Sequence, residues 1–244
     1  DVNGRIIGAT RVQTAGALDD LYLAAAYPVP LGVHYDSGTP SVAVWAPTAL
    51  TTPGVSVNIY DSPTDATAEV FPMTLDESTG VWSFTGPAGW DRKYYTFTLR
   101  VYSYAANAIV TNEVTDPYSV SLSMNSVRSQ FVNLDDADLK PAGWDALALP
   151  ALAAPEDSVI YELHVRDFSI DDASVPAGDR GKFSAFDAAG TAGRQHLQKL
   201  AAAGLTHVHI LPAFDIATID EDSANRVELD DPVEKLCARN AAAA

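Results

Sequence analysis

The stretch SVIYELHVRDFSID, residues 158–171, passes from an apolar pattern to charged residues within a few positions. Residues 159–165 are β-branched, aromatic or aliphatic at most positions, which predicts a buried β-strand. Arg166, Asp167 and Phe168 follow directly, and a long polar loop comes next. In parallel α/β folds the ligand site lies at the carboxyl ends of the strands, so these residues are expected at a functional rim.

A helix and a second strand follow this loop. Residues 191–204 predict an α-helix with an apolar face and a glycine just past its end, from Leu197, Leu200, Ala201 and Gly204. Residues 206–212, THVHILP, predict a strand that ends at Pro212, with Phe214 and Asp215 just beyond it. Strand, loop, helix and strand form a βαβ unit, whose two strands run parallel in nearly all cases. The sequence therefore predicts the start of an α/β barrel or a doubly wound sheet.

Residues 28–133 have a different pattern, which predicts an all-β domain. Short segments rich in β-branched and aromatic residues alternate with turn signals such as TTPG and ESTG. The connections are short, so we expect one β-sandwich. Its expected strands are residues 41–47, 55–60, 81–86, 94–103 and 108–116.

Two less regular segments flank the expected sandwich. Residues 1–27 stay unassigned, because AGALDDLYLAAA fits either a short helix or a covering segment. Residues 134–157 contain three prolines and no sustained period, which predicts a linker. We expect Trp144 to hold this linker against one of the flanking domains.

Composition excludes several classes of partner. The 244 residues carry a net charge of −17, so neither nucleic acid nor an anionic membrane surface would attract the chain. No apolar run reaches the roughly 18 residues of a membrane span. Cys237 is the single cysteine, which excludes an internal disulfide. The start has no signal-peptide form, so we expect any targeting segment to lie outside it, and the tetra-alanine end indicates a cut or unidentified side chains.

Two charged patterns near the expected rim have more than one interpretation. His207 and His209 lie two residues apart on a strand and so point to one side, which suits a zinc site or two packed imidazoles. We favour packing, because no third ligand has suitable spacing. For Arg166 and Asp167 we favour a structural role over a catalytic one. We expect no direct ion pair between them, because adjacent strand residues point to opposite faces.

Acidic runs and tryptophans also have two interpretations each. Residues 171–172 and 220–222 offer oxygen ligands for Ca²⁺, but EF-hand spacing is absent and solvated loops are the default. Trp82 and Trp90 suit either a sugar-stacking surface or core packing. Trp45 lies in an expected strand and is assigned to the core. Neither a G-x-S-x-G elbow nor a phosphate-binding glycine loop occurs.

Several motifs together resemble one enzyme family. They are VIYELHVRDFS (159–169), RGKFSAF (180–186), LQKLAAAGLTHVHILPAFDIATIDED (197–222), VAVWAPTA (42–49) and VTDPYSVSLSMNSVRSQFVNL (114–134). These stretches resemble the type I pullulanases and limit dextrinases, starch-debranching members of the α-amylase superfamily of glycoside hydrolases. The upstream motifs resemble the family's β-sandwich, a carbohydrate-binding module of family 48.

The resemblance implies hydrolysis of α-1,6 branch points in pullulan, amylopectin and limit dextrins with retention of configuration. That chemistry needs two carboxyl groups about 5 Å apart, and a complete barrel needs about 250 residues. Residues 158–244 make up about a third of that length, and the family's catalytic segments are absent from them. No catalytic residue and no metal ligand is therefore assigned, and the substrate-binding residues are unknown. We expect the 244-residue chain alone to be inactive.

The predicted fold class is multidomain, β plus α/β. An Ig-like β-sandwich precedes the first βαβ of an incomplete (β/α)₈ TIM barrel. The expected divisions are an N-terminal segment, a sandwich, a linker and a truncated barrel, at residues 1–27, 28–133, 134–157 and 158–244.

The expected partners are a branched α-glucan and the remainder of the barrel. We expect that the reaction requires no cofactor. Ca²⁺ is kept as an alternative, with a purely structural role. The resemblance implies a secreted or cell-surface bacterial protein, with a plastid as the alternative location. A non-catalytic starch-binding or adaptor protein is the rival function, and a zinc hydrolase built on His207 and His209 ranks below it.

Overall fold

The computed structural model describes residues 15–26, 30–149, 151–211, 213–214, 219–222, 224–225 and 234. The chain divides into two compact units, Asp1–Lys140 with Asp220–Ala244, and Pro141–Ile219. Each unit is described by itself. Three residues named in the sequence analysis lie outside the described residues: Pro212, Asp215 and Cys237.

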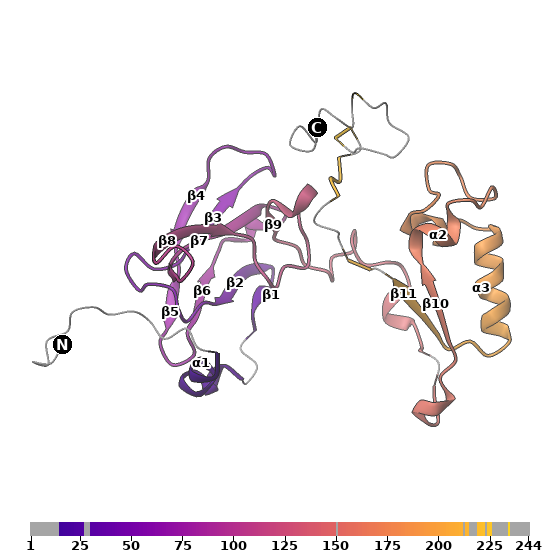
Figure 1. The fold of residues 1–244 in the computed structure, drawn as a ribbon, viewed down its shortest axis with the longest axis horizontal. Helices are drawn as coiled ribbons and strands as arrows, with labels where there is room; N and C mark the ends of the chain where they lie inside the picture. Colours follow the sequence, from indigo (N-terminus) through magenta and orange to yellow (C-terminus); the bar gives the residue numbers. More distant parts are fainter. Residues whose placement is uncertain are drawn as a thin grey trace, which may run out of the picture. The chain divides into compact units, whose positions relative to one another are not determined.

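Two antiparallel sheets build the first unit (Figure 1). One sheet has the order β1 (Gly32–Asp36), β2 (Thr39–Trp45), β6 (Val81–Thr85) and β5 (Thr74–Asp76). The other has the order β4 (Glu69–Pro72), β3 (Ser56–Tyr60), β7 (Tyr94–Ser103) and β8 (Ala108–Val114), with β9 (Ser129–Gln130) beside the start of β7. Shorter elements are α1 (Ala15–Leu21), η1 (Leu23–Ala26), η2 (Ala88–Trp90) and η3 (Met124–Ser126).

Local sequence explains the first hairpin. Ser37 and Gly38 connect β1 to β2, and both have positive φ, +50° and +80°. A two-residue loop with positive φ at both positions matches the right-handed twist of the strands it joins. The resulting register pairs Gly32 with Ala43 and Asp36 with Thr39.

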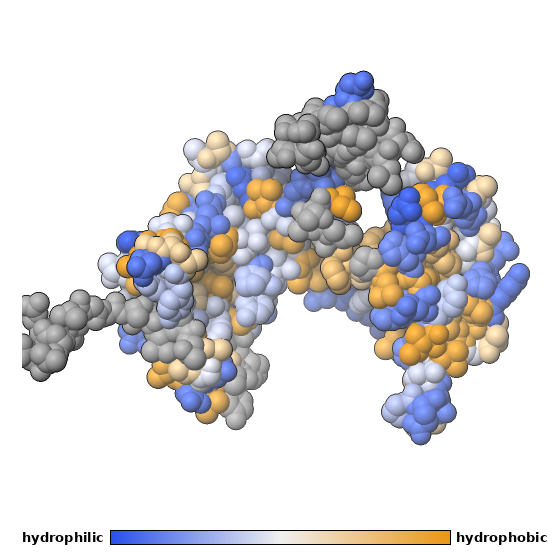
Figure 2. Space-filling model, viewed as in Figure 1, coloured by the Kyte–Doolittle hydropathy of each residue, from blue (hydrophilic) through white to orange (hydrophobic). Residues whose placement is uncertain are grey.

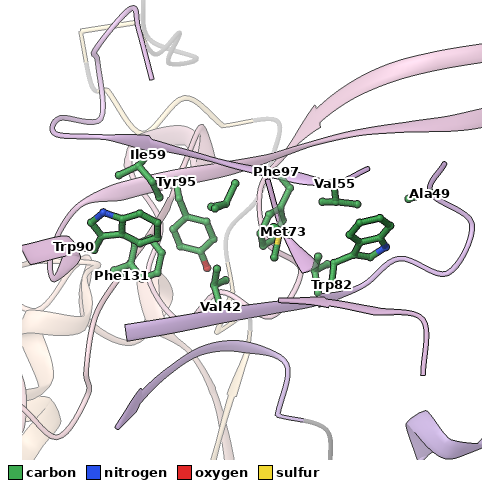
Figure 3. Packing of buried hydrophobic residues seen from close by; sticks show 12 residues of the cluster. Val42, Ala49, Val55, Ile59, Met73, Trp82, Trp90, Tyr95, Phe97 and Phe131 are labelled. Carbon is green, nitrogen blue, oxygen red and sulfur yellow. The ribbon is translucent and has the colours of Figure 1, made fainter. Parts of the chain in front are cut away.

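The core lies between the two sheets and is rich in aromatic rings (Figure 3). Trp82 lies near Val55 and Ala49 toward one end of the core, and Trp90 lies beside Phe131 at the other. The ring centroids of Trp90 and Phe131 are 5.5 Å apart. Trp82 and Trp90 are 4% and 3% exposed, so of their two sequence interpretations core packing is confirmed.

The five strands expected in the sandwich are present as β2, β3, β6, β7 and β8. The observed β7 has the predicted bounds, residues 94–103. The sequence did not reveal β1, β4, β5 and β9, which have two to five residues each. β4, β5 and β9 contain too few alternating positions to give a periodic signal, whereas β1 was missed although it is as long as β3 and β6.

The second unit is a βαβ arrangement, as predicted. β10 (Ile160–His164) pairs in parallel with β11 (His207–Leu211), from Ile160↔His207 to His164↔Leu211. Between them lie α2 (Val165–Ser169), η6 (Phe183–Phe186) and α3 (Ala192–Ala202). The hydroxyl oxygen of Thr191 caps α3 by accepting a hydrogen bond from the Arg194 amide, and Gly204 follows the helix with φ +108°.

Two expectations about the second unit were wrong. β10 is not a buried strand, since Leu163 is 6% exposed but Ile160 is 63% exposed. A two-stranded sheet with one helix beside it cannot cover both faces of its strands. Trp144 of η4 (Trp144–Ala146) is 60% exposed and does not hold the linker in place. η5 (Pro155–Asp157) is the other short helix of this segment.

In the part of the chain that the structure describes, no helix combines the length and the apolar character needed to cross a bilayer.

Candidate functional site

The carboxyl ends of β10 and β11 lie at one edge of the second unit, because the two strands are parallel and in register. Arg166 and Asp167 lie just past the end of β10, in the first turn of α2, and Phe214 lies three residues after the end of β11. Phe168 stacks on Phe186 with ring centroids 5.2 Å apart. A Cβ on Gly193 would be 2.8 Å from the Phe168 ring, so this phenylalanine belongs to the packing of the unit.

Arg166 and Asp167 are in contact, which corrects the expectation that they would not pair. Arg166 Nη1 lies 3.4 Å from Asp167 Oδ1, and both side chains are well exposed. These two residues lie in the short helix α2, where neighbours no longer point to opposite faces. The Asp167 amide also donates to His164 Nδ1 at 3.3 Å, so the imidazole caps this helix.

His207 and His209 are both exposed on β11, so the packed interior expected for them is not present in this unit. His209 Nδ1 lies 2.9 Å from Glu162 Oε2 on the neighbouring strand. His207 Nδ1 lies 2.8 Å from the hydroxyl of Thr206. Among the described residues, no group of three His, Cys, Asp or Glu side chains is arranged to hold a metal ion.

Both acidic runs make specific hydrogen bonds, where solvated loops were expected. Asp172 accepts hydrogen bonds from the amide and hydroxyl of Ser174 and from the Gly193 amide, at 2.9, 2.5 and 3.1 Å. Hydrogen bonds from Ser174 lower the pKa of this carboxyl, because they stabilise its ionised form. In the other run, Glu221 Oε2 accepts from the Asn125 amide at 2.8 Å. The two runs thus fix loop geometry.

A polar cluster spans β3, β7 and β8 in the first unit. Tyr60 and Thr96 each donate a hydroxyl hydrogen bond of 2.7 Å to Glu113 Oε1. The Arg128 guanidinium lies 3.5 Å from the centroid of the Tyr60 ring, which is a cation–π contact. The hydrogen bond from Tyr60 is the largest of the effects that lower the pKa of Glu113. These contacts link β3, β7 and β8 through one carboxylate.

An aromatic pocket lies elsewhere in the first unit, lined in part by Tyr22, Trp45 and Tyr118. Its volume is about 310 Å³. Trp45 ends β2 but is only half-buried, which corrects its assignment to the core. Val42 and Val44 belong to the core cluster, so Trp45, the next residue of the strand, points to the opposite side. Nothing in the sequence connected Tyr22 or Tyr118 with Trp45.

One family model matches the chain. It is "Carbohydrate-binding module 48 (Isoamylase N-terminal domain)", and it matches residues 30–119, which include β1 to β8. The match agrees with the antiparallel, Ig-like sandwich described above.

Curated relatives match nearly the whole chain. Pullulanase 1, chloroplastic, of Arabidopsis thaliana is 42% identical over 233 residues, which are 94% of this chain and 23% of the relative. The pullulanase of Klebsiella pneumoniae is 40% identical over 244 residues, 98% of this chain and 22% of the relative. The chain thus spans less than a quarter of the length of these two relatives.

Solved structures agree with the sequence matches. A Klebsiella pneumoniae pullulanase complexed with maltotriose has a TM-score of 0.83 and 40% identity, over 96% of this chain and 22% of that one. A pullulanase from Bacillus acidopullulyticus has a TM-score of 0.66 and 32% identity, over 78% of this chain and 22% of that one. Residues 30–119 thus match the family-48 carbohydrate-binding module, and the chain is similar over most of its length to one part of the pullulanases.

Proposed function

We propose that the chain is part of a pullulanase-type hydrolase that cleaves α-1,6 branch points in pullulan, amylopectin and limit dextrins. The observation that carries the proposal is the 40% identity to Klebsiella pullulanase over 98% of the chain. The match extends through the parallel β10–β11 unit, so it is not limited to the carbohydrate-binding module. A module alone would be compatible with many functions, whereas a shared module and βαβ unit favour the enzyme.

We propose that β10 and β11 are the first two strands of a (β/α)₈ barrel. Exposed apolar side chains support this, since Ile160, Val208 and Leu211 are 63%, 42% and 39% exposed. Figure 2 shows hydrophobic atoms gathered on the visible face of the unit that contains these strands. Further strands and helices of a closed barrel would cover such a surface.

The catalytic carboxylates of the proposed enzyme are assigned to no residue of this chain. Retaining glycosidases place two carboxyl groups about 5 Å apart, one as nucleophile and one as acid/base. Within the proposal, residues 158–211 contribute to the barrel wall. The proposed reaction requires no organic cofactor, and a structural Ca²⁺ is a matter for metal analysis. The acidic chain suits a neutral glucan as partner and does not suit nucleic acid.

A non-catalytic starch-binding protein is the second candidate. The module match at residues 30–119 favours it, because that range contains β1 to β8 and all of the central core cluster except Phe131. The complex of Klebsiella pullulanase with maltotriose supports a glucan as ligand for both candidates.

The proposed domain division is the one expected from the sequence, 1–27, 28–133, 134–157 and 158–244. We propose secretion or a cell-surface location, with a plastid as the alternative. The chloroplastic relative from Arabidopsis thaliana supports that alternative.

A chimaera tests the enzyme against the binding protein. Residues 1–244 would replace the matching segment of Klebsiella pneumoniae pullulanase, and release of reducing sugar from pullulan would be measured. We expect a folded, active chimaera and no activity from the 244-residue chain alone. In a matched chimaera, Leu163→Asp would place a carboxylate at the buried position of β10 and should abolish activity.

Two results would contradict the proposal. One is a chimaera that folds, as judged by circular dichroism and cooperative melting, but releases no sugar. The other is pullulan hydrolysis by the 244-residue chain of verified mass.

A further inference from the structure

The first unit contains two neighbouring pockets that share one aromatic side chain. Tyr22 lines a pocket of about 310 Å³ together with Trp45 and Tyr118. It also lines a pocket of about 200 Å³, whose other walls include Trp82 and Glu77. The larger volume falls at the lower end of the range for small-molecule sites, about 300–1,000 Å³.

The aromatic walls of the larger pocket are held in position by contacts that need no ligand. The Trp45 indole N–H donates to the carbonyl oxygen of Thr79 at 2.8 Å, which fixes the orientation of the ring. A Cβ on Gly32 would lie 3.0 Å from the Tyr118 Cβ, so glycine lets Tyr118 come close to β1. Rings that are already oriented lose little conformational entropy when a ligand binds.

Tyr22 is held against the sandwich by close packing. A Cβ built on Gly80 would lie 3.2 Å from Cδ1 of the Tyr22 ring and 2.8 Å from the Pro47 Cβ. Tyr22 stays half-buried, so part of its surface remains accessible. The segment that contains α1 and η1 thereby adds a ring to a surface that the strands alone would not complete.

The chemistry around these rings suits a neutral, hydroxyl-rich ligand. An aromatic face presents apolar surface to the C–H face of a pyranose, and Tyr and Trp combine an apolar body with a polar tip. Two exposed carboxylates, Asp19 and Glu77, line the two pockets and accept hydrogen bonds from hydroxyl groups. They would repel an anionic ligand, as would the net charge of −17.

We propose that Trp45 and Tyr22 form a binding site for a short linear α-glucan, with Asp19 and Glu77 as hydrogen-bond acceptors for its hydroxyls. The choice of an α-glucan rests on the proposed function, which gives the enzyme a substrate of that class. The site combines residues of the binding module with the α1–η1 segment that precedes it, and it contributes no group to catalysis. Its role is to hold glucan chains to the protein.

Titration of the 244-residue chain with maltohexaose tests the site, by calorimetry and by intrinsic tryptophan fluorescence. We expect binding that weakens about tenfold in Tyr22→Ala, because the variant loses one stacking face. Tyr22→Phe keeps the ring and should bind like the parent chain. Trp45→Phe should bind more weakly, because the smaller ring loses the hydrogen bond to Thr79.

Trp144→Ala is the matched control, because Trp144 is an accessible tryptophan of the second unit, 60% exposed. It should leave binding unchanged. Cellohexaose, a β-linked glucan, should bind at least about tenfold more weakly than maltohexaose. Equal binding of the two sugars would overturn the assignment to α-glucans.

The inference is wrong if the parent chain binds no maltohexaose, or if Tyr22→Ala and Trp45→Phe bind as tightly as the parent. Both variants lie outside the central core, and circular dichroism would verify their folding. An active chimaera without maltohexaose binding would reject this site and leave the proposed enzyme intact. Binding at Tyr22 with an inactive chimaera would support this site and reject the enzyme.

Discussion

The two units differ in how fully they enclose a core, although both expose some apolar side chains on their strands. In the first unit Val57, Tyr95 and Phe97 are at most 1% exposed, and they belong to a core enclosed by two sheets. In the second unit Ile160 and Val208 are 63% and 42% exposed, although they lie on strands. Apolar side chains that remain exposed on strands form a surface that another element or a partner commonly covers. The sandwich therefore has an enclosed core between two sheets, whereas the two strands of the βαβ unit are only partly covered.

Truncation of a core side chain has the largest expected effect on the free energy of unfolding and tests the difference between the two units. Phe97→Ala in the sandwich should lower the free energy of unfolding by about 3–5 kcal/mol, from lost burial and a new cavity. Ile160→Ala, the matched truncation on β10, should change it by less than about 0.5 kcal/mol, because that side chain is exposed. Denaturant unfolding followed by residue-resolved NMR signals from each unit reports the difference.

Equal costs for Phe97→Ala and Ile160→Ala would show that β10 is covered and that the two units do not differ. The outcome would also remove the main support for further barrel strands beside it.

A methyl group added at a glycine of the sandwich tests how tightly its core is packed. A Cβ on Gly86 would lie 2.2 Å from the buried Trp90 ring, whereas a Cβ on Gly89 would have nothing within 4 Å. Gly86→Ala should therefore destabilise the sandwich by about 1–3 kcal/mol. Gly89→Ala is the control and should leave the melting temperature nearly unchanged, as measured by calorimetry. A similar melting temperature for both variants would mean that Trp90 has room to move.

A pH titration of the polar cluster gives the smallest effect. The folded-state pKa of Glu113 is lowered, chiefly by the hydrogen bond from Tyr60. The carboxyl therefore contributes stability above its unfolded pKa, and this contribution is lost as the pH falls through the folded pKa. Tyr60→Phe should move the Glu113 pKa back up toward the ordinary glutamate value.

NMR titration of the Glu113 carboxyl carbon measures this shift directly. Tyr102→Phe is the control, because the Tyr102 hydroxyl donates to Asn107 and not to Glu113. An unchanged Glu113 pKa in Tyr60→Phe would contradict the assigned cause.

Long periodic segments were predictable from the sequence, and contacts between distant segments were not. β7 was predicted with its observed bounds, because seven of its ten residues are β-branched or aromatic. The parallel pairing of β10 and β11 followed from the strand–helix–strand order.

The remaining features depend on how the chain folds back on itself. Trp45 was assigned to the core because its strand was recognised but its neighbours were not. The contact between Asn125 and Glu221 joins residues 96 positions apart, so no local sequence pattern could predict it. The contact of Arg166 with Asp167 was missed because the helix α2 begins directly after β10.

The separation in sequence between β10 and β11 also sets an order of events on the ribosome. Ile160 pairs with His207, so the parallel strands cannot meet until 47 further residues have been synthesised. The aromatic core that ends at Phe131 has by then been translated in full. Domains fold as units and amino-terminal ones fold first during synthesis, so the sandwich is positioned to finish while its neighbour is still nascent. The sandwich would then already be folded when the later strands pair.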